Sequence, residues 1–122
     1  MKVENAARIQ HILACIEKIQ YLAKQLHTQD RFEQMWVEQD AIIRNLEVIG
    51  EASVNISADL KQRYPDVLWA EMKGMRNVIV HRYFGVELHR IWNTVINDIP
   101  LVKAQIEQIS KDINASATQE AT

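Results

Sequence analysis

The chain has 122 residues, of which 48% are apolar and 25% are charged, and its formal net charge is −2. This length and apolar fraction suit one compact domain with a core of its own. The slightly negative charge excludes a protein that coats nucleic acid through a broad positive field. Any contact with nucleic acid must therefore be local.

A single cysteine, Cys15, excludes an internal disulfide and a zinc site built from cysteines. Residues 1–5 lack the apolar core of a secretory signal, and no uncharged apolar stretch is long enough to span a membrane. We therefore expect a cytoplasmic protein that does not use a membrane as a partner.

Apolar residues recur at helical spacing along residues 6–26, which predicts a long amphipathic helix. Residues 27–30 interrupt this pattern. Asp30, with Glu33 three residues later, is typical of a capping box, so a second helix is expected to begin there. An interruption is expected near Trp36, before another apolar stripe over residues 37–56.

The helix predicted for residues 37–56 carries a seam of alternating charge opposite its apolar stripe. Its members stand at spacings of four, three and four: Asp40, Arg44, Glu47 and Glu51. One interpretation is a solvated face on which opposite charges pair. The other is that Glu47 or Glu51 holds a functional side chain in position, with Arg76 and His81 as candidates.

Residues 57–63 suit a short capped helix that Tyr64-Pro65 stops, and helical spacing restarts over residues 67–75. The pattern after Gly85 meets Pro100, which predicts a kink at residues 97–100 before the helix resumes. Residues 114–122 lack apolar anchors. We therefore expect one helical domain over residues 1–113 and a disordered tail over residues 114–122.

No segment shows sustained alternation with the period of two that marks a half-buried strand. The sequence therefore predicts an all-α, up-and-down helical bundle with three or four long helices and one or two extra short ones.

Residues that can carry chemistry concentrate between Gly74 and Gly85. Arg76 and His81 suit phosphodiester chemistry, because one supplies a fixed cation for phosphoryl charge and the other titrates near neutral pH. On an ideal helix these two positions lie about 140° apart. They converge only if the helix ends near His81 or if a second chain completes the site.

Other kinds of site find little support. Neither a His-Glu-x-x-His nor a Glu-x-x-His pair occurs, so no metal site is predicted. The serines and Cys15 lack a neighbouring base, which argues against covalent catalysis. No cofactor is expected, and His11, His27 and His89 are interpreted as ordinary helix residues.

Several blocks of this sequence stand in the order found in the HepT-like branch of the HEPN superfamily. They are residues 40–52, Tyr64-Pro65, residues 74–77 and residues 81–86. His81 and Tyr83 after Arg76 complete the Arg-x4-His-x-Tyr signature of that branch. The chain resembles this family from about Ile9 to Ile113.

The resemblance implies a metal-independent endoribonuclease that acts as a homodimer. His81 would take the proton from a ribose 2′-hydroxyl and Arg76 would stabilise the phosphate, which yields a cyclic phosphate end. Asn77 and Arg82 would assist or bind phosphate. The family also implies a minimal nucleotidyltransferase as antitoxin partner, which adenylylates Tyr83 and so blocks access of RNA.

Two positions depart from the family pattern: His11 stands where an acidic residue is common, and Arg82 where a small residue precedes the tyrosine. Two other functions also stay open. One is a non-catalytic helical module that docks a nucleotidyltransferase. The other is a structural dimerising bundle in which His81 merely caps a helix.

Overall fold

The computed structural model describes residues 3–77 and 88–121 of the chain. Every regular element within these two ranges is a helix, which confirms the predicted all-α class. Three helices are long: α1 (Val3–Leu26), α3 (Trp36–Val54) and α8 (Ile99–Ala121). The short elements are α2 (Gln29–Gln34), α4 (Ala58–Arg63), α5 (Trp69–Gly74), the 3-10 helix η1 (Met75–Asn77), α7 (Leu88–Asn93) and the π-helix η2 (Thr94–Asp98).

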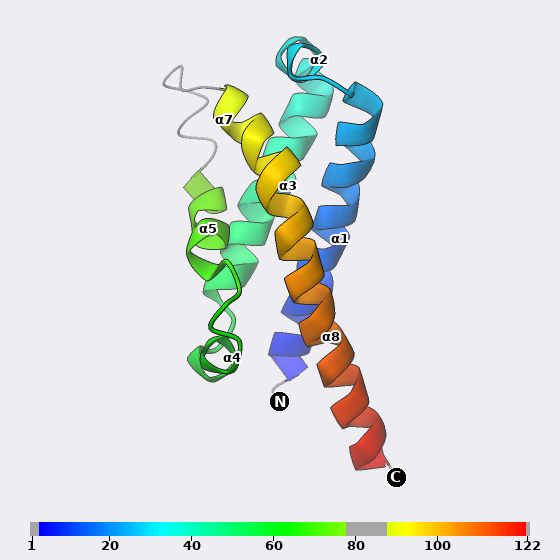
Figure 1. Ribbon diagram of the computed structural model, residues 1–122, viewed down its shortest axis with the longest axis vertical. Coiled ribbons are helices and arrows are strands. Elements are labelled where there is room, and N and C mark those ends of the chain that lie inside the picture. Colours follow the sequence, from blue (N-terminus) through cyan, green and yellow to red (C-terminus); the bar gives the residue numbers. More distant parts are fainter. Residues whose placement is uncertain (1–2, 78–87, 122) are drawn as a thin grey trace.

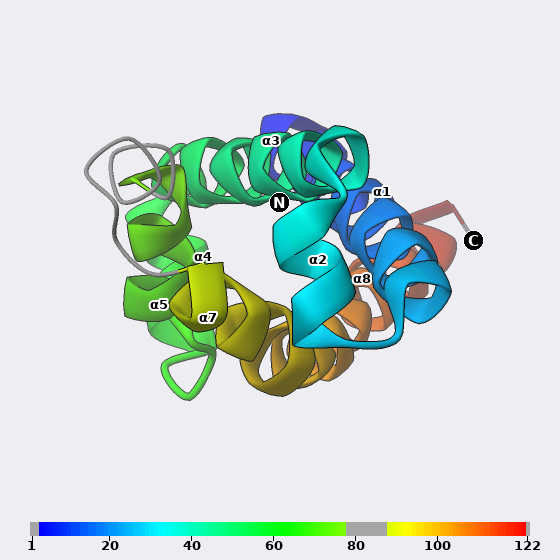
Figure 2. The ribbon, with the colours of Figure 1, turned by 90° about the horizontal axis from the view of Figure 1, so that it is seen from above.

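The helices run up and down along one axis, as the sequence predicts. In Figure 1, α1 rises from the N-terminus, α3 descends, α5 rises, and α7 leads down through η2 into α8. Figure 2, seen from above, shows α2 lying across that end of the bundle. The described elements thus form four passes around one core.

The core is built from the apolar stripes that the sequence shows. Most of its fully buried members come from the three long helices: Ile9, Ile12, Ile16 and Ile19; Ile42, Leu46 and Ile49; Ile99, Val102, Ile106 and Ile109. Each such side chain contributes about 1.5–3 kcal/mol relative to an exposed one. The apolar stripe on each helix therefore fixes which of its faces remains free for function.

An aromatic pair closes the upper end of the core. Phe32 on α2 is fully buried, and its ring stacks on that of Trp92 on α7, with 5.3 Å between the ring centroids. Two segments distant in sequence are thereby joined, and the pair contributes beyond the area it buries.

The junction between α1 and α2 differs from the predicted capping box. His27 has a φ of 67°, the left-handed conformation that ends α1. Thr28, and not Asp30, is the N-cap of α2, since its hydroxyl accepts a hydrogen bond from the Arg31 N–H at 3.2 Å. Both residue types cap helices well, and the extended backbone at Thr28 decides between them.

The kink predicted before Pro100 takes the form of a π-turn. In η2 the Ile99 N–H donates to the carbonyl of Thr94, five residues earlier. Pro100 has no N–H and its ring crowds the preceding turn, so a locally widened helix relieves both problems. The interruption lies at Thr94–Asp98, slightly before the predicted position.

The start of α4 agrees with the sequence prediction, whereas the end of α8 differs from it. Ser57 caps α4 through a hydrogen bond from the Leu60 N–H at 3.3 Å, as predicted. By contrast, α8 continues to Ala121, where the sequence predicted disorder from residue 114. No proline or glycine interrupts this tail and its alanines favour helix.

Among the described helices, none is long and apolar enough to cross a membrane.

Candidate functional site

Arg76 lines a cleft of about 360 Å³ between α1, α3 and η1. The α-helix before it ends at Gly74, so Arg76 lies on the 3-10 turn Met75–Asn77. Met75 is buried and anchors this turn in the core, whereas Arg76 and Asn77 are exposed. The sequence predicted a helix that carries Arg76 and ends near His81; the α-helical part ends earlier, and His81 lies outside the described residues.

A glycine on α3 allows η1 to approach this closely. Gly50 is buried, and a Cβ atom built on it would lie 2.8 Å from the Cβ and 2.9 Å from the Cα of Arg76, and even closer to its backbone nitrogen. Such contacts are impossible without a backbone shift. The absence of a side chain at residue 50 therefore sets the path of the chain at Arg76.

The first wall of the cleft belongs to α1, where Arg8 and His11 stand three residues apart on one helix face. Arg8 is half-buried and His11 is exposed. Neither side chain belongs to the core stripe, which places both beside the cleft.

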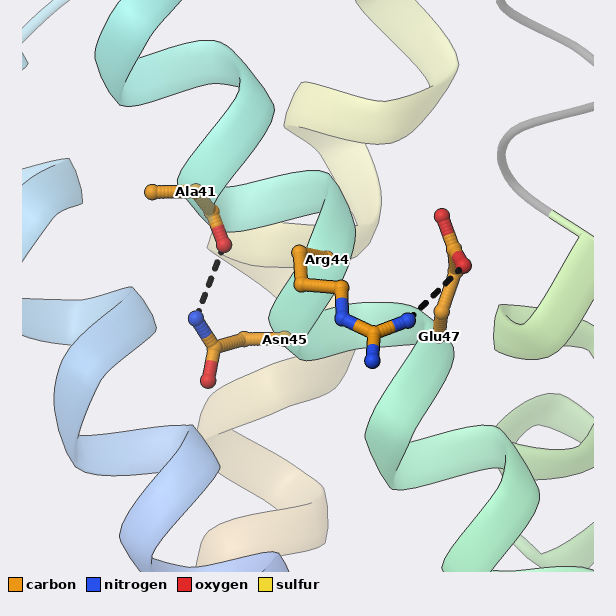
Figure 3. A network of polar contacts seen from close by, with 4 residues as sticks. All are labelled: Ala41, Arg44, Asn45 and Glu47. Carbon is orange, nitrogen blue, oxygen red and sulfur yellow. Dashed lines mark hydrogen bonds and ion pairs between the residues drawn. The ribbon is translucent and has the colours of Figure 1, made fainter.

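The second wall is the polar seam of α3. Arg44 Nη1 lies 3.8 Å from Glu47 Oε2, with side chains 75% and 20% exposed, so the pair is a surface ion pair that contributes little stability. Figure 3 shows Arg44 reaching along the helix toward Glu47, while the Asn45 amide donates to the Ala41 carbonyl at 2.8 Å.

Glu47 and Glu51 thus line the same cleft as Arg76. The seam was also interpreted as a solvated face on which opposite charges pair. This interpretation holds in part, because Glu47 pairs with Arg44 and not with Arg76. The positioning role of these carboxylates stays a prediction. His81, Arg82 and Tyr83 lie outside the described residues, so their placement relative to Arg76 is not described.

Sequence reasoning overlooked three contributors to the cleft: Arg8, His11 and Gly50. His11 was interpreted as an ordinary helix residue. A signal existed for the first two, since residues spaced by three beside a buried stripe share one helix face. The role of Gly50 depends on how α3 and η1 pack, which no local pattern reveals.

A second cavity, of about 250 Å³, lies on the other side of η1 between α5, α7 and η2. Burial, and then the neighbouring carboxylate of Glu71, raises the pKa of Asp98 in this cavity. Over the described ranges, no three histidine, cysteine or carboxylate side chains gather closely enough to hold a metal ion.

Comparison with known proteins places the chain among ribonucleases of one family. The family model described as "Ribonuclease HepT-like" matches residues 12–109. The probable ribonuclease HepT of Thermococcus cleftensis is 39% identical over 111 residues, which cover 91% of this chain and 100% of that protein.

Two proteins of Methanocaldococcus jannaschii are also similar. One, named as a gamma-glutamylcyclotransferase and putative RNase, is 36% identical over 93% of this chain and 51% of its own length. The other, a putative RNase, is 44% identical over 70% of this chain and 71% of its own. No solved structure gives a significant match. The extent of the family match and the full-length relative show that this chain belongs to the HepT-like ribonuclease family.

Proposed function

We propose that the chain is a metal-independent endoribonuclease and the toxin of a toxin–antitoxin pair. Membership of the HepT-like family supports ribonuclease activity. The observation that carries the proposal is the exposed Arg76, which η1 presents at a cleft wide enough for a small ligand.

In the proposed reaction His81 takes the proton from a ribose 2′-hydroxyl, and the resulting oxygen attacks the neighbouring phosphorus. The bond to the 5′-oxygen breaks, that oxygen acquires a proton, and a 2′,3′-cyclic phosphate remains. Arg76 stabilises the negative charge that accumulates on the phosphoryl oxygens. DNA lacks the 2′-hydroxyl and is not cleaved by this route.

A cleavage assay with labelled RNA in the presence of a metal chelator tests the proposal. We expect activity to fall at least about a hundredfold in His81→Ala and in Arg76→Ala, the usual cost of losing a proton-transfer group or a charge-stabilising donor. His89→Ala and Arg63→Ala are matched controls, because both residues are exposed and lie outside the cleft. Full activity in either Arg76→Ala or His81→Ala would place the reaction elsewhere, and an inert wild type would favour the docking module.

Regulation forms the second part of the proposal: a minimal nucleotidyltransferase adenylylates Tyr83. The added phosphate would compete with RNA for Arg76 and Arg82 through charge-assisted hydrogen bonds. Co-expression with that enzyme should add one or more adenylate masses to the chain, and Tyr83→Phe should remove them while the nuclease stays active. An adduct that persists in Tyr83→Phe, or no adduct at all, would mean that the partner inhibits by forming a complex and not by modifying Tyr83.

A further inference from the structure

Two guanidinium groups line the cleft from different elements: Arg8 on α1 and Arg76 on η1. Among the described residues neither forms an ion pair or a hydrogen bond, although Glu47 and Glu51 line the same cleft. A guanidinium has five donors and keeps its charge at every physiological pH. As far as the described residues go, both groups therefore have donors available for an anion.

The charge around the cleft favours an anion locally. Three guanidinium groups, those of Arg8, Arg44 and Arg76, outnumber the two carboxylates, and the imidazole of His11 adds a further donor. The whole chain, in contrast, has a net charge of −2. The cleft thus has a local excess of positive groups that the chain as a whole lacks, which suits a short anionic segment better than a long duplex.

The cleft does not end at Arg8. A neighbouring hollow of about 560 Å³ shares Arg8 and Asn55 with it and is lined also by Glu4, Asn5 and Ser57. The Asn5 amide donates to the Ser57 hydroxyl at 2.9 Å, and the Ser57 N–H donates to the Asn5 oxygen at 3.1 Å. These reciprocal bonds fix the far wall, so the groove is preformed.

We propose that this groove binds the nucleotide next to the cleavage position in single-stranded RNA, with Arg8 on the flanking phosphate. The inference rests on the proposed ribonuclease function, in which Arg76 binds the scissile phosphate. Charged grooves that follow the backbone are the usual way in which proteins bind single strands. Arg44 contributes less to RNA binding than Arg8 does, because its guanidinium already pairs with the carboxylate of Glu47.

Binding of fluorescent oligonucleotides tests this subsite apart from catalysis. The probes are a dinucleotide and two tetranucleotides extended on the 5′ or the 3′ side, each with a 2′-deoxy residue at the cleavage position. Arg8→Gln should weaken one of the tetranucleotides by about tenfold or more, the usual scale for a hydrogen bond to a charged group. It should also reduce the slope of log affinity against log salt by about 0.7.

Two further variants serve as controls. Arg63→Gln makes the same charge change on exposed surface outside the groove and should bind as the wild type does. Arg8→Lys keeps the charge and should restore part of the affinity. Gln and Arg have similar helix propensities, so the thermal stability of Arg8→Gln should match that of the wild type.

The outcomes separate this inference from the proposed function. If the wild type cleaves RNA but Arg8→Gln binds every oligonucleotide as tightly as the wild type does, the subsite is overturned and the nuclease remains. If the dinucleotide binds as tightly as both tetranucleotides, the flanking phosphates add nothing to the affinity, which also overturns the subsite. If RNA binds with the expected dependence on Arg8 but is never cleaved, the subsite stands and the nuclease fails.

Discussion

Arg76 owes its position to a residue that has no side chain. Gly50 lies within α3, where glycine costs about 1 kcal/mol relative to alanine, yet any larger residue would collide with the backbone of Arg76. Packing between α3 and η1 thus outweighs helix propensity at this position. The contact with α3 thus positions the backbone from which the side chain of Arg76 extends.

We expect Gly50→Ala to reduce RNA cleavage strongly while the helical fold persists, because η1 must move to admit the added methyl group. The overpacking should lower the free energy of unfolding by about 1–3 kcal/mol. Activity measured well below the melting temperature, together with circular dichroism, separates displacement of Arg76 from unfolding.

Gly74→Ala is the matched control, since a Cβ atom there would meet nothing within 4 Å. It should leave cleavage unchanged and alter the stability by at most about 1 kcal/mol. Equal losses of activity in the two variants would show that the close contact at Gly50 does not matter for function.

At the scale of the elements, the C-cap residue of α4 makes a polar contact with α8 at the lower end of the bundle. The phenol of Tyr64 donates to Asp112 Oδ2 at 2.7 Å. This bond raises the pKa of Tyr64 and, with a second bond from Gln108, lowers the pKa of Asp112. The ordinary values of the two groups are about 10 and about 3.9.

The direction of these shifts fixes the pH range over which the bond stabilises the fold. The lowered pKa of Asp112 gives stability that is present above about pH 4 and is lost as the pH falls further. The raised pKa of Tyr64 gives stability that is present below about pH 10 and is lost above it. Both contributions are complete at pH 7.

Tyr64→Phe should therefore lower the melting temperature at pH 7, and its difference from the wild type should shrink as the pH falls below about 4. Thermal melts at several pH values measure this. Tyr21→Phe is a control, because Tyr21 is 64% exposed on α1 and should show no difference at any pH. A constant difference for Tyr64→Phe across the acid range would assign its effect to packing alone.

The same elements show what sequence reasoning can and cannot reach. The stripes of α1 and α3 follow from the helical period, and the break before Pro100 follows from proline chemistry. The choice of Thr28 over Asp30 as the N-cap depends on backbone angles that both residue types tolerate. The placement of Arg8 and Arg76 around one cleft depends on how α1, α3 and η1 pack, which is a property of the assembled bundle.

At the scale of the whole molecule we expect a symmetric homodimer. One cleft in a chain of net charge −2 offers few cations to RNA, whereas two clefts that face each other across a two-fold axis double the local positive charge. Light scattering at micromolar concentration should give twice the mass of a single chain. A monomeric mass, with undiminished cleavage per chain on dilution, would contradict a shared site.

The contact between residue 50 and residue 76 also bears on how this protein tolerates sequence change. A side chain at position 50 is compatible only with a different backbone path at position 76, so substitutions at these two places cannot be judged separately. In a library that varies every position, residue 50 should rank among the least tolerant sites although it reaches no substrate. Variants that survive there should carry second changes within η1, and that epistasis would reveal the contact to a geneticist who had never seen the structure.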